Sequence, residues 1–158
     1  MCAIGREMVG FARHSKNEQR MSGLIETQAG EARLRILVVE DNDMLRTMFL
    51  KAFPSMHKVY AASGTKEGWK LFLETVPHVV FLDIGLPDGN GNDLAREMKE
   101  CNPATYIVMS TANNEMDNKK EAVRNRVDGF IVKPFSKAAL SECVDQFMNI
   151  QRRNGQKR

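Results

Sequence analysis

Short, uninterrupted apolar runs separated by amphipathic stretches dominate the pattern of hydrophobic and polar positions from residue 34 onward. Four runs are strong and a fifth, Lys58–Ala62, is weaker. The strong runs are Leu34–Val39, Val79–Leu82, Tyr106–Met109 and Phe130–Val132. Continuous runs of this length are typical of strands that are buried on both faces of a parallel sheet. The pattern therefore predicts five strands.

Stretches with helical spacing lie between these runs and after the last one. They cover roughly residues 43–53, 65–74, 91–101, 115–125 and 136–150. In the last stretch, apolar residues from Leu140 to Phe147 form one stripe, and Ser136 is a suitable N-cap. Because parallel strands need crossover connections, this alternation predicts an α/β, doubly wound parallel sheet with helices on both faces.

The two ends of the chain differ from this body. Residues 1–32 show no sustained period and contain scattered glycines, so we interpret them as a poorly ordered N-terminal leader, with Met1 or Met21 as the start of translation. Residues 33–150 are the predicted domain, and residues 151–158 form a basic C-terminal tail. No apolar run approaches the ~18 residues that cross a bilayer, and a secretory signal is absent, so we expect a cytoplasmic protein without membrane contact.

The net charge of +3 comes from the C-terminal tail. Residues 151–158 carry four cations and no acid, whereas acids and bases balance in residues 1–32 and the body is close to neutral. A nucleic-acid-binding domain normally spreads Lys and Arg over one face of its fold. Nucleic-acid binding through the tail is therefore the weaker alternative to a solvated end.

Reactive side chains follow four of the five predicted strands. In an open α/β sheet, the ligand site lies just beyond the carboxyl ends of the strands. The residues at these ends are Glu40 and Asp41 after the first strand, Asp83 after the third, Ser110 and Thr111 at the fourth, and Lys133 at the fifth. Three carboxylates, hydroxyl groups and one ammonium group are thus expected to converge at one edge of the sheet.

Three carboxylates in one crevice repel one another and require cations nearby. Two unit charges 4 Å apart interact by about 4 kcal/mol at an effective dielectric constant of 20. Lys133 supplies one fixed positive charge. A hard divalent ion that accepts carboxylate and backbone oxygens fits the remainder, and Mg²⁺ is the usual such ion. His and Cys are missing from these strand ends, so a zinc or thiolate site is not indicated.

The segments VVEDN, LDIGLPDGNG, STA and VKPF, in this order, resemble the receiver domain of two-component response regulators. The resemblance covers about residues 33–150. It implies a flavodoxin-like fold with strand order 2-1-3-4-5, and a phosphoacceptor signalling protein rather than an enzyme. It also implies two partners: a sensor histidine kinase or phosphotransfer protein, and a downstream protein target.

The resemblance also implies roles for individual residues. Asp83 would be the phosphoacceptor, attacking the phosphorus of a phosphohistidine. Glu40, Asp41 and Asp83 would hold Mg²⁺ together with the backbone carbonyl of Gly85.

On the same basis, Lys133 would pair with the carboxylate of Asp83 and then bind a phosphoryl oxygen. The hydroxyl of Thr111 and the amide of Ala112 would also bind phosphoryl oxygens. Thr111 and Phe130 would form the conformational switch. The Lys133–Pro134 bond is expected to be cis.

Several alternatives remain. Only about eight residues follow the fifth predicted helix, so we expect a stand-alone receiver; the alternative is a fragment of a longer regulator without its output domain. An aspartate phosphatase would need a second acid two residues after Asp83, where Gly85 stands. The glycines of GLPDGNG fit neither dinucleotide-binding nor P-loop spacing. His14, His57 and His78 share no metal-ligand spacing.

Overall fold

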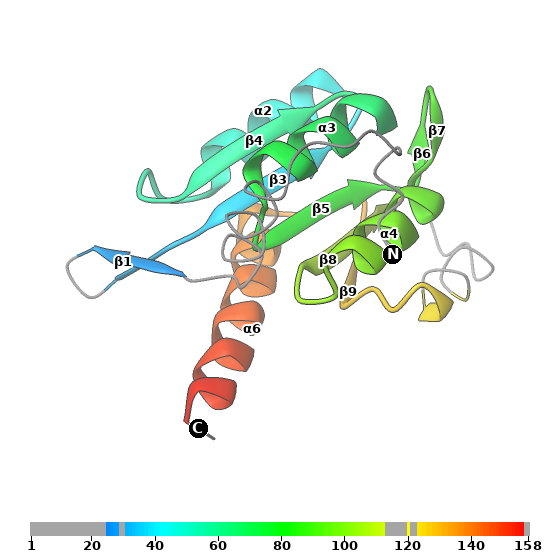
Figure 1. Cartoon of the computed structure of the whole chain (residues 1–158). Coiled ribbons are helices and arrows are strands. Elements are labelled where there is room, and N and C mark those ends of the chain that lie inside the picture. Colours follow the sequence, from blue (N-terminus) through cyan, green and yellow to red (C-terminus); the bar gives the residue numbers. More distant parts are fainter. Residues whose placement is uncertain (1–24, 29–30, 113–119, 121–122, 157–158) are drawn as a thin grey trace.

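The computed structural model describes residues 25–28, 31–112, 120 and 123–156. Within them, five parallel strands form one sheet (Figure 1). These strands are β3 (Arg35–Val39), β4 (Lys58–Ala62), β5 (Val79–Asp83), β8 (Tyr106–Thr111) and β9 (Gly129–Val132). Their order in the sheet is β4-β3-β5-β8-β9, which confirms the expected order 2-1-3-4-5.

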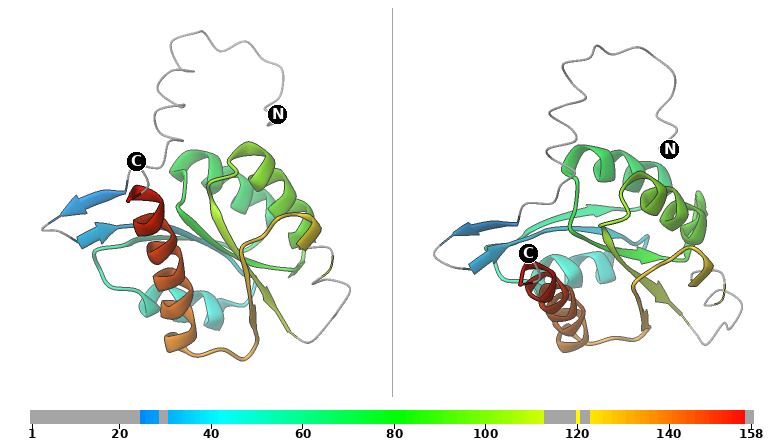
Figure 2. Two further views of the ribbon diagram at one scale, coloured as in Figure 1. Left: turned by 90° about the horizontal axis from the view of Figure 1, so that it is seen from below. Right: turned by 60° about the horizontal axis from the view of Figure 1, so that its bottom comes forward.

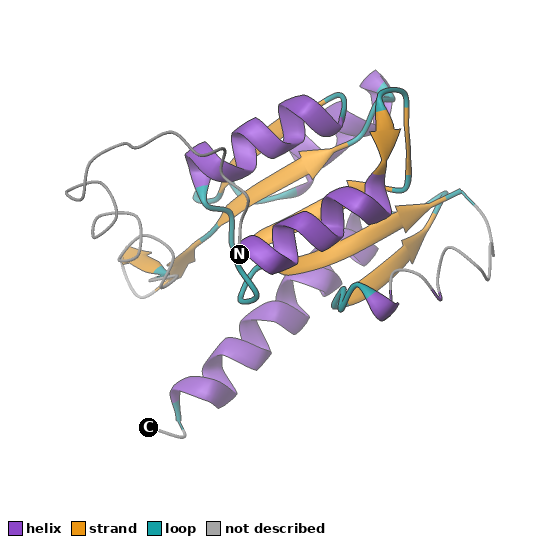
Figure 3. Cartoon of the chain, turned by 45° about the vertical axis from the view of Figure 1, so that its right-hand side comes forward, coloured by secondary structure: helices purple, strands orange, loops and turns teal. Residues whose placement is uncertain are grey.

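Helices cover both faces of the sheet (Figures 2 and 3). Helices α2 (Asp43–Ala52) and α6 (Lys137–Gly155) pack on one face, and helices α3 (Thr65–Thr75) and α4 (Gly91–Cys101) pack on the other. The predicted helix at 115–125 falls largely outside the described residues. The observed fold is thus the predicted doubly wound sandwich.

The alternation of side chains along β3 explains why there are two cores. Ile36 and Val38 point into a cluster with residues of α2 and α6, whereas Leu37 and Val39 point into a cluster with residues of α3 and α4. Successive side chains of a strand point to opposite faces. A continuous apolar run is therefore what a strand between two helical layers needs.

Two short antiparallel pairs accompany the sheet. β1 (Glu26–Gln28) pairs with β2 (Glu31–Arg33) just before β3, almost entirely within residues 1–32, which were expected to be a poorly ordered leader. These short strands lack an apolar run, so the hydrophobic pattern did not predict them. β6 (Gly85–Leu86) pairs with β7 (Gly89–Asn90) directly after β5. The domain boundaries expected from the sequence stay predictions.

Helix α6 continues past the expected end at residue 150 and reaches Gly155. Arg152 and Arg153 lie in its last turn, where cations interact favourably with the partial negative charge of a helix C-terminus. Part of the predicted basic tail is therefore helical. Among the residues that the structure describes, no helix has both the length and the apolar character needed to cross a bilayer.

His57 gives the fold a pH-dependent contact. This half-buried side chain lies just before β4, and its Nδ1 accepts a hydrogen bond from the backbone N–H of Leu34 at 3.4 Å. Burial lowers the pKa of His57 below its ordinary value. The unfolded chain therefore takes up this proton at higher pH than the folded chain. The corresponding stability is complete above about pH 6.5 and is lost as the pH falls below it.

We predict that His57→Asn reduces the pH dependence of stability, because the Asn side-chain oxygen can accept the same hydrogen bond but does not titrate. Urea denaturation at about pH 7.5 and about pH 5.5 should show a smaller drop in the free energy of unfolding for the variant than for the wild type. An equal drop in both proteins would contradict this role of His57.

Candidate functional site

The two central strands bring the three carboxylates together. Glu40 and Asp41 directly follow β3, and Asp83 is the last residue of β5. The parallel register pairs Val39 with Leu82, so that Glu40 and Asp83 end neighbouring strands at the same level. Carboxylate oxygens of Glu40, Asp41 and Asp83 lie within 4.8 Å of one another. We call these three residues the carboxylate cluster.

Lys133 reaches the carboxylate cluster from the carboxyl end of β9. Its Nζ lies 3.0 Å from Asp83 Oδ2 and 2.9 Å from Glu40 Oε2. The backbone N–H of Lys133 donates to the carbonyl of Thr111 at 2.8 Å, which fixes the start of the side chain. One ammonium group therefore bridges acids that come from two different strands.

The charges of this site depend on one another. Burial raises the pKa of Glu40, and the charge of Asp83 acts in the same direction, while Lys133 and the N–H of Asn42 oppose them. Burial alone would lower the pKa of Lys133, but its hydrogen bonds to Glu40 and Asp83 raise it overall. Lys133 is therefore held as a cation between the two acids.

The loop that carries Glu40 and Asp41 is held by side chains of the following helix. Arg46 Nη1 donates to the backbone carbonyls of Glu40 and Asp41, each at 2.8 Å. Asn42 caps α2 by accepting from the N–H of Leu45 at 3.0 Å. The sequence pattern did not predict either of these contacts. The preference of Asn for N-caps could have identified Asn42, whereas no sequence signal indicates the bonds of Arg46.

The other predicted residues lie on or directly after the strands and turn that carry the site. Thr111 is buried and ends β8, the strand between β5 and β9. Ala112 follows it and is exposed, and Gly85 lies two residues after Asp83, with its N–H 3.3 Å from Asp83 Oδ1. Phe130 is half-buried on β9, in register with Met109. The Lys133–Pro134 peptide bond is cis, as expected.

The carboxylate cluster suits a hard divalent cation such as Mg²⁺. Its side-chain donors are all carboxylate oxygens, and the backbone carbonyl of Gly85 belongs to the turn directly after Asp83. Glu40 and Asp83 are buried, whereas Asp41 is exposed, so that water could complete the coordination. Three negative charges exceed the single positive charge of Lys133, which favours a further cation.

The two described histidines have structural roles. His57 accepts a backbone hydrogen bond before β4, and His78 is buried, with its Nδ1 accepting from the N–H of Arg35 at 3.0 Å. His14 lies outside the described residues.

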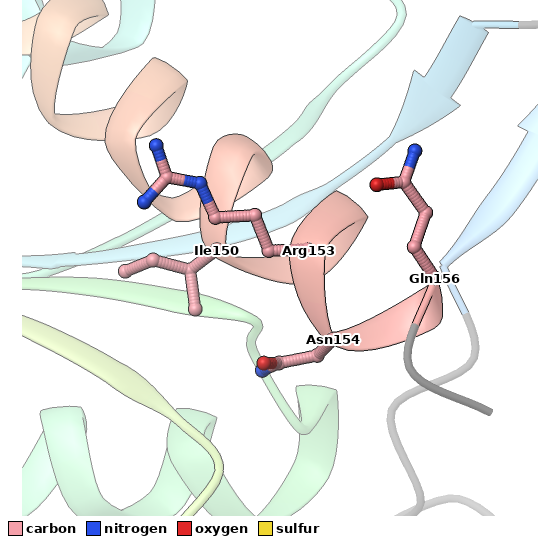
Figure 4. A pocket seen from close by; sticks show the side chains of 4 residues that line it. All are labelled: Ile150, Arg153, Asn154 and Gln156. Carbon is pink, nitrogen blue, oxygen red and sulfur yellow. The ribbon is translucent and has the colours of Figure 1, made fainter.

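A pocket beside the end of α6 is separate from this chemistry. It is lined by Ile150, Arg153, Asn154 and Gln156 (Figure 4). Helix α6 begins close after Lys133 and has 19 residues, a length of about 28 Å, so its last turn lies at the opposite edge of the sheet. The pocket shares no residue with the carboxylate cluster.

Comparison with known proteins supports the family resemblance found in the sequence. The family model of the response regulator receiver domain matches residues 36–145. The virulence transcriptional regulatory protein PhoP of Salmonella typhimurium (strain 14028s / SGSC 2262) is 30% identical over 122 residues, which are 77% of this chain and 53% of PhoP. The regulatory protein AtoC of Escherichia coli (strain K12) is 30% identical over 118 residues, which are 74% of this chain and 26% of AtoC. The chain spans about half or less of the length of these relatives.

Solved structures share the fold. A CheY-like response regulator receiver domain protein from Methanospirillum hungatei JF-1 has a TM-score of 0.73 at 22% identity, covering 77% of this chain and 98% of that chain. The BeF3-activated receiver domain of DrrB, a Thermotoga maritima protein, has a TM-score of 0.68 at 25% identity, covering 74% and 98% of the two chains.

We predict that removing the Lys133 cation destabilises the protein increasingly as the pH rises. Lys133→Met keeps the apolar stem but leaves Glu40 and Asp83 facing each other, so Glu40 holds its proton more tightly when folded than when unfolded. Because this raised pKa makes unfolding more favourable at higher pH, the loss in free energy of unfolding should grow between about pH 5 and about pH 8 and reach about 2 kcal/mol.

Urea denaturation in buffer without divalent cations measures this effect. Adding Asp83→Asn to Lys133→Met removes one of the facing charges and should recover most of the loss. A loss in Lys133→Met that is the same at both pH values would contradict the interpretation.

Proposed function

Because the chain belongs to the response regulator receiver domain family, we propose that it accepts a phosphoryl group on Asp83 from a phosphohistidine of a partner protein. The observation that carries this proposal is the position of Lys133 Nζ, 3.0 Å from Asp83 Oδ2, inside a cluster of three carboxylates. The chain would act as a phosphoacceptor for signalling and not as a turnover enzyme.

The proposed transfer needs little covalent chemistry from the protein. A carboxylate oxygen of Asp83 would attack the phosphorus, and the P–O bond would form as the P–N bond to the imidazole breaks, with the electron pair remaining on the nitrogen. Phosphoryl transfer depends mainly on in-line positioning and on neutralising charge on the phosphoryl oxygens. Lys133 is placed to supply a positive charge there without any proton transfer.

Glu40, Asp41, Asp83 and the carbonyl of Gly85 would hold Mg²⁺. When bound, Mg²⁺ would add further charge neutralisation at the phosphoryl oxygens. The exposed side of Asp41 would leave this edge open to solvent and to the incoming phosphohistidine.

Thr111 and Phe130 are the proposed switch. The hydroxyl of Thr111 and the amide of Ala112 would bind phosphoryl oxygens, and the resulting shift of Thr111 would open space for the Phe130 ring. Burial of Thr111 at the end of β8 and partial burial of Phe130 on the neighbouring β9 support this arrangement. Such a local change in hydrogen bonding can bias a surface between two states.

The proposed partners are a sensor histidine kinase or phosphotransfer protein upstream and a protein target downstream, which this chain would meet in the cytoplasm. A second possibility is that the chain is the receiver portion of a longer regulator. It is favoured by the relatives PhoP and AtoC, of which the chain covers only 53% and 26%. The intact coding sequence, with the mass of the natively expressed protein, distinguishes the two. Nucleic-acid binding through Arg152 and Arg153 is less well supported, because the body of the protein is close to neutral.

Phosphorylation with a small phosphodonor tests the proposal directly. We expect acetyl phosphate and Mg²⁺ to add one phosphoryl group to the wild type, detected by intact mass, and nothing to Asp83→Asn. Chelation of divalent cations should abolish the modification, and Asp41→Asn should reduce the rate at limiting Mg²⁺ by about tenfold or more. No modification of the wild type, or equal modification of Asp83→Asn, would refute it.

The switch is tested with beryllofluoride, a non-transferable stand-in for the phosphoryl group, in the presence of Mg²⁺. We expect beryllofluoride to shift the amide NMR signals around Phe130 in the wild type and in Thr111→Ser, which keeps the hydroxyl. The same signals should shift much less in Thr111→Ala, because the hydrogen bond that couples the two residues is lost. Equal shifts in Thr111→Ala would show that Thr111 does not transmit the change.

A further inference from the structure

The turn after Asp83 is tied to helix α3 by a carboxylate that the proposed phosphoryl transfer does not use. This turn is the β6–β7 hairpin, and Asp88 lies at its tip. Asp88 Oδ1 accepts from the backbone N–H of Thr65 at 2.7 Å, and Asp88 Oδ2 accepts from the backbone N–H of Lys66 at 3.1 Å. We call these two hydrogen bonds the Asp88 clamp.

The clamp supplies the N-terminal hydrogen-bond acceptor that helix α3 lacks. The N-cap residue of α3 is Gly64, which has no side chain to accept the first N–H groups of the helix. These groups have no partner within a helix and carry partial positive charge, so a carboxylate is their preferred acceptor. The two hydrogen bonds also lower the pKa of Asp88, which favours the ionised carboxylate further.

Gly64 and Gly89 permit this close approach. A Cβ atom at Gly64 would lie 2.7–2.9 Å from the carboxylate atoms of Asp88, closer than real Cβ contacts allow. A Cβ atom at Gly89 would lie 3.1 Å from the side chain of Thr65. The hairpin and the start of α3 are therefore fitted to each other through two glycines.

The base of the same hairpin is held at the strand end. The N–H of Gly91 donates to the carbonyl of Ile84 at 2.8 Å, and Gly91 lies so close to the backbone of Asp83 that any Cβ atom would collide with it. Gly85 lies between this base and the clamp. It is exposed, and nothing lies within 4 Å of the place where its Cβ would be. It pairs with Asn90 across the hairpin, so its position depends on how the hairpin as a whole is held at its base and at its tip.

From this geometry we propose that Asp88 is a positioning residue for the metal site: by tying the hairpin to α3, it holds the Gly85 carbonyl and N–H in place beside Asp83. The inference rests on the proposed function, in which Gly85 is a ligand of Mg²⁺. Without the clamp, the hairpin tip is released and the carbonyl occupies its liganding position less often. Binding of Mg²⁺ weakens, whereas Asp83 and Lys133 stay in place.

Two measurements test this role: the dissociation constant of Mg²⁺ from isothermal titration calorimetry without phosphodonor, which should rise for Asp88→Ala, and phosphorylation rates with acetyl phosphate over a range of Mg²⁺ concentrations. Asp88→Ala should raise the Mg²⁺ concentration needed for the half-maximal rate about five- to tenfold and change the maximal rate less than about twofold. Asp88→Asn, which keeps one acceptor oxygen, should have an intermediate effect.

Asp93→Ala is the matched control. Asp93 is an exposed acid in the first turn of α4, next to the hairpin, and it pairs with Arg96 at 3.1 Å and not with α3. Its removal takes away one nearby surface charge and should leave the Mg²⁺ requirement unchanged. Equal Mg²⁺ curves for Asp88→Ala and Asp93→Ala would overturn the role of Asp88. Failure of the wild type to be phosphorylated would instead refute the proposed function.

A double-mutant cycle separates positioning from general destabilisation. Gly64→Ala pushes the Asp88 carboxylate off α3 from the other side, so by itself it should raise the Mg²⁺ requirement in the manner of Asp88→Ala. In the Asp88→Ala background it should add little, because the collision is gone. Additive effects would contradict the clamp. A lower maximal rate with an unchanged Mg²⁺ requirement would likewise contradict it, because simple loss of folded protein has that signature.

Discussion

The ion pairs of Lys133 with Asp83 and Glu40 are the interaction on which the arrangement of the site depends. The carboxylate oxygens of Asp83 and Glu40 lie within 4.8 Å of one another. Two carboxylates this close would repel by several kcal/mol if no cation lay between them. Lys133 can reach them only because β9 lies next to β8, which in turn lies next to β5. The order of the strands in the sheet therefore determines that a cation lies beside the two acids at the carboxyl edge.

The surrounding structure fixes each partner of these ion pairs by a separate device. Arg46 and the N-terminus of α2 hold the loop of Glu40 and Asp41, and the bond from Lys133 to the Thr111 carbonyl holds the end of β9. Asp88 holds the turn after Asp83 against α3. Contacts to backbone groups therefore position the loop of Glu40 and Asp41, the end of β9 and the turn after Asp83, while the carboxylates of Glu40 and Asp83 pair with Lys133.

The apolar strands and the polar carboxyl edge of the sheet have different roles in this domain. Alternate residues of the strands pack into two separate cores, one on each face of the sheet. This close packing holds the carboxyl edge of the sheet in place. Thr111 and Phe130, the residues proposed to respond to a phosphoryl group, lie at or near the ends of β8 and β9, where Thr111 is buried and Phe130 is half-buried. The proposed signal therefore begins at the carboxyl edge and travels along β8 and β9 to the surface.

The sequence by itself determined the five strands, their alternation with helices and the residues at the carboxyl ends of the strands. These follow from short-range periodicity and from one rule about where parallel strands end. The tertiary structure decided which side chains make contact. These contacts are the double ion pair of Lys133, the hydrogen bonds of Arg46 to the loop of Glu40 and Asp41, and the Asp88 clamp on α3. The tertiary structure also decided the β1–β2 pair and the continuation of α6 to Gly155. The contacts of Lys133, Arg46 and Asp88 follow no local pattern, because each joins groups that only folding brings together. The β1–β2 pair and the last turn of α6 were not predicted because their residues lack an apolar period.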